Sequence, residues 1–447
     1  MGLFDKWFGG ASKEEKAPPS APMIRFGRYS DNNKSLAKTK RWFEAEDLFK
    51  AKKFNESIEA FFDYLRDEEA DNVLLKKEGA FYSFEIYQGT KIVKGLINEQ
   101  EITASVSLAR MEKPSVPVMR RLLELNYSLY YSRYALQGDK LCMLFDTPKD
   151  TASPNKLYYG LKEIATKADK QDDLLITDFN TLQAVDDSHV TFFPEQETEM
   201  KYRYFQHWIQ STLKRVEELN QDSFSGGIAY LLLTLLYRID YLITPEGKLL
   251  NEIERINNLY WSNKEEKTSV ERNQILKDAF HKLMAWPKEE VVKYFYRSRA
   301  SFAITMPKPH NAIADSIHSA NENMFWYRDN NYPDIAIAVM EYGLAYAQYS
   351  YSLPKPLNDF FDMMMEINNP IYYADLGATH HLLENDRPSA DRITQRIEEI
   401  IRPFSDKYPK LQLDTSKLNF NSVLDFLLSF LSEIQNLNFD SPPHQTA

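Results

Sequence analysis

The chain has 447 residues, a formal net charge of −11 and 43% hydrophobic residues. This length predicts two or three domains, because a single hydrophobic core stops growing near ~250 residues. The negative charge argues against a general nucleic-acid binder, which needs a clustered basic surface. The one cysteine, Cys142, excludes an internal disulfide and a cysteine-rich zinc site, and we expect it to be a buried strand residue.

Four large apolar side chains stand within the first ten residues: Leu3, Phe4, Trp7 and Phe8. A helix would place them along one side. We therefore treat them as partner-binding candidates, which dock on a protein or contact a membrane peripherally through residues 1–10. The alternative is that they pack back on the protein itself. The segment that follows is rich in Lys, Pro, Ser and Ala, so we expect residues 1–29 to be a flexible tail.

The sequence shows neither a targeting signal nor a membrane span. A secretory signal peptide would need a longer apolar stretch and a small-residue cleavage site. Lys6 stands where a myristoylation signal has Ser or Thr. The longest apolar run, residues 228–236, is shorter than the ~20 residues of a transmembrane helix. We therefore expect a cytoplasmic protein.

Residues 30–173 alternate between helical and strand periodicity. Residues 102–109 alternate apolar and polar side chains, as in a sheet with one buried face. Gly138 supplies the positive φ of a tight hairpin. The expected elements are helical stretches at 34–52 and 54–66, strands at 81–87, 91–97 and 102–109, a helix at 114–126, strands at 129–136 and 140–145, and a helix at 157–168.

Three local runs in this region carry a family likeness: Leu122-Leu123-Glu124-Leu125-Asn126, Arg133-Tyr134-Ala135-Leu136 and Lys140-Leu141-Cys142-Met143-Leu144-Phe145. With the element order, they resemble the class I type III secretion chaperones and the related YbjN family over about a third of the chain. The resemblance implies a domain of helix, three strands, helix, two strands and helix. It also implies binding of extended segments of partner proteins, commonly by a dimer, and it supplies no catalytic residue. The extra helix ahead of the sheet and the long C-terminal half depart from the family.

Tyrosines gather between the short helix and the next strand, at Tyr127, Tyr130, Tyr131 and Tyr134. Tyrosine joins a large apolar surface to a polar tip and is enriched at protein interfaces. We take Tyr127, Tyr130 and Tyr131 as further partner-binding candidates. The alternative is that they face the domain's own core.

The second half of the chain is predicted to be helical. Residues 174–199 are polar and poorly periodic, which indicates a connector with a short strand at 190–193. Residues 200–439 should form an all-α domain, and 440–447 a frayed tail. The expected helices are 202–220, 225–243, 247–261, 269–285, 288–302, 312–328, 333–351 and 357–367. The helix at 225–243 is apolar on most sides and should be central.

Two segments, 332–347 and 42–65, each resemble one tetratricopeptide-like helical hairpin, although no tandem array follows. Small residues let helices approach closely, and we expect them to serve packing rather than to line a peptide groove. They are Ala336, Ala338, Gly343, Ala345 and Ala347.

Histidines close to carboxylates are the metal-ligand candidates. His380 and His381 on a helix would point about 100° apart, so only His381 and Glu384 would share a face. A second group has the same weakness: His310, Asp315 and His318. No third ligand can be placed in either group. The chain has no Gly-rich phosphate loop and no Gly-x-Ser-x-Gly elbow, so we expect no metal, no cofactor and no catalytic residue.

The sequence thus predicts an α+β fold, with a chaperone-like domain followed by an all-α helical domain. The favoured function is a non-enzymatic cytoplasmic protein that holds a partner polypeptide, with a homodimer left open. Two alternatives remain. One is an enzyme whose inter-domain site leaves no local motif, and the other is a peripheral membrane scaffold anchored by the N-terminal aromatic residues.

Overall fold

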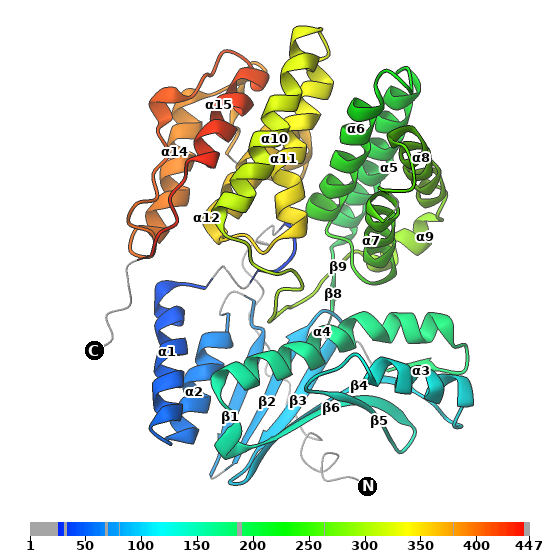
Figure 1. Ribbon diagram of the computed structural model, residues 1–447, viewed down its shortest axis with the longest axis vertical. Helices are drawn as coiled ribbons and strands as arrows, with labels where there is room; N and C mark the ends of the chain where they lie inside the picture. Colours follow the sequence, from blue (N-terminus) through cyan, green and yellow to red (C-terminus); the bar gives the residue numbers. More distant parts are fainter. Residues whose placement is uncertain are drawn as a thin grey trace.

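The computed structural model describes residues 26–30, 34–67, 70–79, 81–185, 190–262, 264–378 and 380–441. It confirms the predicted α+β class, with 58% helix and 15% strand. A sheet with its covering helices forms the N-terminal part, and helices form most of the C-terminal part (Figure 1). The candidates Leu3, Phe4, Trp7 and Phe8 lie outside the described residues.

A seven-stranded antiparallel sheet organises the N-terminal part, in the order β1-β2-β3-β4-β6-β5, with the short β7 paired to the end of β4. Gly138, at a φ of 64°, turns the chain between β5 and β6. The strands are β1 (Val73–Glu78), β2 (Phe81–Gln88), β3 (Lys91–Ile97), β4 (Glu101–Arg110), β5 (Arg133–Gln137), β6 (Lys140–Pro148) and β7 (Gln183–Ala184). The helices are α1 (Leu36–Lys50), α2 (Phe54–Leu65), α3 (Val116–Asn126) and α4 (Pro154–Asp178).

The helices and strands predicted for this part are present, except that β5 begins at Arg133 and not at residue 129, and β1 is an addition to them. Its sequence, Val-Leu-Leu-Lys-Lys-Glu, lacks apolar alternation, and its residues change from buried Val73 to exposed Glu78. Pairing with β2 along its whole length defines this strand instead. Helix α4 is longer than predicted and includes the beginning of the expected connector, because Leu175 still belongs to the core.

Helix α4 lies across one face of the sheet and closes the core there (Figure 1). The alternating residues of β4 confirm one buried face, and Cys142 is buried in β6, as expected. Gly160 lets α4 approach the sheet closely, since a Cβ at this position would lie 2.4 Å from the Phe145 ring. A buried ion pair between Lys91 and Asp172, at 2.6 Å, also joins β3 to α4.

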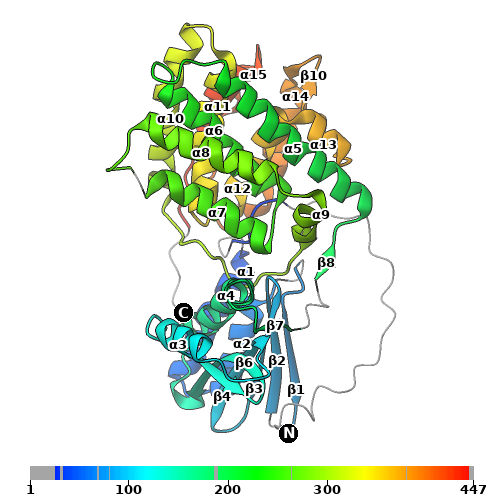
Figure 2. The same cartoon turned by 90° about the vertical axis from the view of Figure 1, so that its right-hand side faces the viewer.

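The C-terminal part is a bundle of α5–α8 beside a second group, α10–α15 (Figures 1 and 2). The described helices are α5 (Glu195–Glu217), α6 (Ser225–Arg238), α7 (Gly247–Trp261), α8 (Ser269–Met284), α9 (Lys288–Val291), α10 (His310–Asp329), α11 (Pro333–Ser350), α12 (Lys355–Asn368), α13 (Pro370–Asp375), α14 (Ala390–Ile401) and α15 (Val423–Gln435). Strand β8 (Thr191–Phe192) matches the short strand expected in the connector, and it pairs with β9 (Tyr296–Arg297). Strand β9 and the pair of β10 (Leu383–Glu384) with β11 (Arg387–Pro388) interrupt the expected all-α pattern.

Helix α6 is central, as predicted, because it packs against α5, α7, α8 and α11. It continues as a π-helical turn, Ile239–Ile243. By length and composition this continuous helix is able to cross a membrane, yet 78% of its apolar window is buried inside the protein. Its apolar surface therefore serves the core of the bundle.

The predicted close packing of small residues occurs between α10 and α11. A Cβ at Gly343 would lie 2.7 Å from the Cβ of Ala320, so the two helices touch at this glycine. Residues 333–347 lie in the single helix α11, and the hairpin consists of α10 and α11 rather than of residues 332–347 alone. The other tetratricopeptide-like segment does form two packed helices, α1 and α2.

The predicted helix at 288–302 is wrong. Helix α9 ends at Val291, a 3-10 turn follows, and the chain is extended at β9. Residues 298–303 then leave the bundle and pack against the sheet-bearing part, where Phe302 joins the core. Tertiary contacts thus override the local helical spacing. In a helix, the backbone N–H and C=O groups of residues 298–303 would bond to one another and could not bond to the sheet-bearing part.

Gln88, at the end of β2, fixes this inserted segment. Its Oε1 accepts hydrogen bonds from the backbone N–H groups of Ser301 and Phe302, both at 3.1 Å, and its Nε2 donates to the Phe302 carbonyl at 3.3 Å. The Ser301 hydroxyl donates to the carbonyls of Asn72 and Tyr87. All of these groups are buried, so each bond satisfies a polar group that has no access to water.

The first described residues also pack on the helical part, although they fall in the expected tail. Phe26 lies against the rings of Tyr241 and Tyr373, at centroid distances of 5.9 and 5.1 Å. Arg28 donates to Asp240, with its Nη2 2.6 Å from Oδ1. The chain therefore contacts the helical part before it builds α1 and the sheet, and it returns to that part at α5.

We predict that Gln88→Ala destabilises the protein by about 1–3 kcal/mol, because it leaves buried N–H and C=O groups unpaired. The measurement is the free energy of unfolding from urea titration followed by circular dichroism. Gln100→Ala, at an exposed position in the turn between β3 and β4, is the matched control and should change stability by less than about 0.5 kcal/mol. Equal effects of the two substitutions would show that the Gln88 amide does not hold the two parts together.

Candidate protein-binding surface

The three candidate tyrosines face solvent and not the core. The relative exposure is 95% for Tyr127, 91% for Tyr130 and 42% for Tyr131. Val116 and Leu123 on the preceding helix are 81% and 70% exposed. Apolar side chains this exposed, gathered on one helix and the loop after it, mark interaction sites more often than chance surface positions. We call these five residues the α3–β5 surface.

Helix α3 separates an inward from an outward face. Val118 and Leu122 are buried against the sheet-bearing core. Val116, Leu123 and Tyr127 are spaced by seven and then four residues, which places them in one stripe along the opposite side of the helix. Sequence inspection did not separate Leu123 from buried Leu122, and it omitted Val116. The seven-and-four spacing is the signal that distinguishes the outward stripe.

Glu163 of α4 holds the loop that carries the tyrosines. Its carboxylate accepts the backbone N–H groups of Tyr130, Tyr131 and Ser132 at 2.9, 2.9 and 2.8 Å, and also the Ser132 hydroxyl at 2.7 Å. Burial by itself raises the pKa of Glu163, but these hydrogen bonds outweigh it and hold the pKa below its ordinary value. The loop is thus fixed before any partner arrives, which lowers the entropy cost of binding.

The two edges of the sheet are partly covered. On β5, the Asn126 side chain accepts from the Tyr134 N–H at 2.7 Å and donates to the Tyr134 carbonyl at 3.4 Å. On β1, the outer residues Lys76, Lys77 and Glu78 are charged. Both devices discourage the addition of another strand. Contact through side chains of the α3–β5 surface is therefore favoured over extension of the sheet.

The histidine candidates are not brought together as a metal site. His380 and His381 lie between α13 and β10, outside any helix, and His381 has a φ of 47°, so the argument from helical spacing was wrong. His380 Nδ1 lies 3.2 Å from Glu366 Oε2, while Glu384 pairs with Arg392. The described residues contain no group of three or more His, Cys, Asp or Glu side chains that could hold a metal.

The second histidine group is separate as well. His310 begins α10, and its Nε2 lies 2.9 Å from the carbonyl oxygen of Ile434. This contact joins α10 to α15, and burial lowers the pKa of His310. Asp315 and His318 lie farther along α10, and the described residues form no three-ligand cluster there.

The pKa of Lys201 is shifted more than that of any other described lysine, and the surroundings of this side chain give it a structural role. It is 1% exposed, and its Nζ donates to the Ile243 carbonyl at 3.0 Å and to Thr244 Oγ1 at 3.1 Å. Burial lowers the pKa of Lys201 to about 7. Catalytic lysines share such a pKa, but this amine closes the end of the π-helical turn.

Neither of two comparisons with known proteins supplies a relative. No protein-family model matches the chain, and no curated protein matches it significantly. The geometry of the described residues therefore carries the functional argument.

Replacing Glu163 should loosen the tyrosine loop in a pH-dependent way. Since the folded-state pKa is lowered, its stabilising effect is present above the unfolded value of ~4.3 and is lost as pH falls through the folded value. We expect Glu163→Gln to cost about 1–3 kcal/mol at pH 7. Unfolding free energies at pH 7 and in acid, beside the exposed control Glu265→Gln, check this. A pH-independent difference would contradict it.

The Lys201 amine should make stability rise with pH. Because its folded-state pKa of about 7 lies below the unfolded value of ~10.4, the unfolded chain binds more protons between these values. The stability of the wild type relative to Lys201→Met should therefore increase from pH 6.5 to pH 9, as measured by urea denaturation. Lys214→Met, at an exposed position on the same helix, controls for loss of a lysine. A constant difference between wild type and Lys201→Met would refute the assignment.

Proposed function

We propose that this is a cytoplasmic protein-binding protein that holds a partner polypeptide on the α3–β5 surface. The observation that carries the proposal is the outward stripe of α3 together with the exposed tyrosines after it. The side chains of Tyr127 and Tyr130 are more than nine-tenths exposed, with no intramolecular packing to account for them. Tyrosine is one of the residues that dominate binding energy at protein interfaces.

The surface has the make-up of a recognition site on a rigid support. Two aliphatic side chains on a helix supply apolar area, and three tyrosines add area with hydroxyl groups at the rim. The Glu163 carboxylate keeps the loop in place from the neighbouring helix. Arg120, Arg121 and Glu124 lie among the apolar positions of α3 and would add charge selectivity.

The likeness to the class I chaperones supports the same kind of activity. It rests on separate observations, which are the order of elements and the three local sequence runs. Edge coverage at β5 modifies that expectation, since the Asn126 amide occupies the backbone groups of Tyr134. We therefore propose side-chain docking onto α3 as the mode of partner binding. A second copy of the chain is one form such a partner takes, and its interface would be self-complementary.

A site-specific cross-linking experiment tests the proposal. A photoreactive amino acid replaces Tyr127 in the full chain, and a matched one replaces Ile371, which is 70% exposed on the helical part. We expect a discrete partner band from the first position only. Leu123→Glu in the same chain should abolish the band, because it places a charge in the centre of the apolar stripe.

Mass spectrometry of the band separates a foreign partner from a second copy of this chain. With the partner in hand, Tyr130→Ala should weaken binding by about 2 kcal/mol. The proposal fails if both cross-linker positions give the same bands, or if Leu123→Glu leaves the Tyr127 band unchanged while circular dichroism shows the fold intact.

A further inference from the structure

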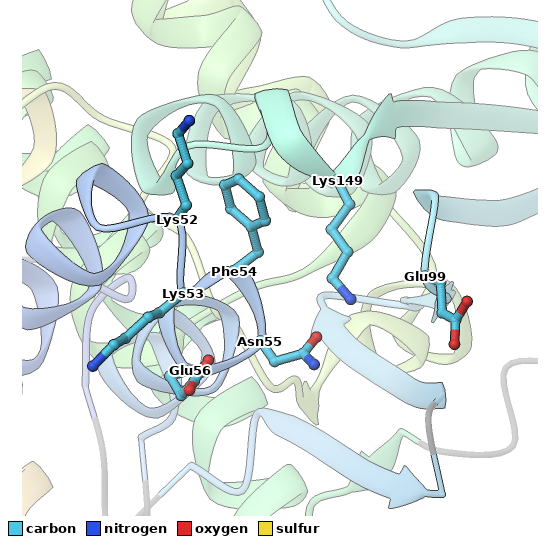
Figure 3. A pocket seen from close by; sticks show the side chains of 7 residues that line it. All are labelled: Lys52, Lys53, Phe54, Asn55, Glu56, Glu99 and Lys149. Atoms are coloured by element: carbon cyan, nitrogen blue, oxygen red, sulfur yellow. The ribbon is translucent and has the colours of Figure 1, made fainter.

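A polar hollow of about 340 Å³ lies in the sheet-bearing part, at the start of α2. Figure 3 shows the side chains around it. Three segments meet here: the turn into α2, the turn between β3 and β4, and the 3-10 turn after β6. The lining residues are Lys52, Lys53, Phe54, Asn55, Glu56, Glu99 and Lys149.

Lys149 is the unusual member of this group. It is 8% exposed, and within the described residues its ammonium group has neither a hydrogen bond nor an ion pair. Its backbone N–H donates to the Gln100 carbonyl at 2.8 Å, which fixes the start of the side chain. Figure 3 shows the side chain extending into the hollow toward Asn55. The side chain is thus mostly buried while its ammonium group remains open to the hollow, so an anion in the hollow would pair with it favourably.

The start of α2 supplies a second set of donors facing the same space. The N-cap residue Lys53 makes no side-chain cap. The backbone N–H groups of Phe54, Asn55 and Glu56 donate to no other group among the described residues. Free N–H groups at a helix N-terminus carry partial positive charge and bind anions. The 12-residue length of α2 allows this effect to develop fully.

The charge at the centre of the hollow also favours an anion. Three lysines and two glutamates line it, and Figure 3 shows the Lys52 and Lys53 side chains pointing away from Lys149, which leaves the Lys149 ammonium as the charge facing the centre. Figure 3 shows Glu56 beside Lys53, on the side away from Lys149, while Glu99 lies at the opposite rim. Glu99 attracts the Lys149 ammonium without pairing with it, and burial lowers the pKa of Lys149. The centre of the hollow therefore keeps an excess of donors over acceptors.

We propose that this hollow binds the phosphate group of a small phosphorylated compound, with Lys149 as its principal charged partner. A phosphate presents several oxygens and up to two negative charges, which suits one ammonium group beside several N–H groups. The hollow is larger than a single phosphate ion, and its polar rim accommodates a sugar-sized remainder. This proposal is independent of partner binding at the α3–β5 surface.

Calorimetry on the full chain tests it, with inorganic phosphate, a hexose 6-phosphate and the uncharged hexose as probes. We expect both phosphates to bind and the hexose not to bind. Tighter binding of the hexose phosphate would identify a phosphorylated metabolite as the ligand, and equal binding would identify the phosphate ion itself. Lys149→Met keeps the aliphatic stem and removes the charge, so it should weaken binding of both phosphates about tenfold or more.

Two controls keep the result interpretable. Lys267→Met removes an exposed lysine on the helical part and should leave phosphate affinity unchanged. Lys149→Met should melt at about the same temperature as the wild type in phosphate-free buffer, because it keeps the buried aliphatic stem and removes only an ammonium group that opens onto the hollow. The proposal is overturned if the wild type binds neither phosphate up to about 10 mM, or if Lys149→Met binds them as tightly as the wild type.

Discussion

The hydrogen bonds between Gln88 and the backbone of Ser301 and Phe302 hold the two parts of the molecule in one arrangement. They replace water at groups that are wholly buried, so the arrangement cannot change unless all of them break together. Phe302 adds apolar contact with the sheet core, and Arg299 lies over the Tyr87 ring at 3.4 Å. A helix at 288–302 would have left the end of β2 without these partners.

This insertion shows where inference from the sequence stops. Local periodicity was sufficient for α6, α7 and the hairpin of β5 and β6, because their apolar patterns match the faces that they bury. It was not sufficient for β1, whose partner strand defines it, or for residues 298–303, whose conformation depends on groups more than two hundred positions away. A sequence pattern read over about ten residues contains no information on contacts between positions so far apart.

The same distinction applies to the candidate sites. Tyr127 and Tyr130 could be proposed from residue type and clustering alone, and the structure places both in solvent. The role of Glu163 could not, since it lies over thirty residues from the loop that it holds. The role of Lys149 could not be predicted for the same reason. It is one of 54 basic residues in this chain, and only its surroundings in the fold distinguish it from the others.

The α3–β5 surface and the Lys149 hollow are both connected to strand β6. The tyrosine loop leads into β5 at Arg133, which pairs with Leu144 of β6, and β6 ends at Pro148, immediately before Lys149. At ~3.3 Å per residue, the four residues from Leu144 to Pro148 separate these two points by roughly 13 Å along the strand. The direct route for coupling between a bound phosphate and a bound partner therefore runs along the end of β6. That part of the strand is paired with β4, and a strand held in a sheet transmits little displacement. The two sites should therefore bind their ligands independently. Any change in the affinity of one site when the other is occupied would measure how far the sheet departs from a rigid body.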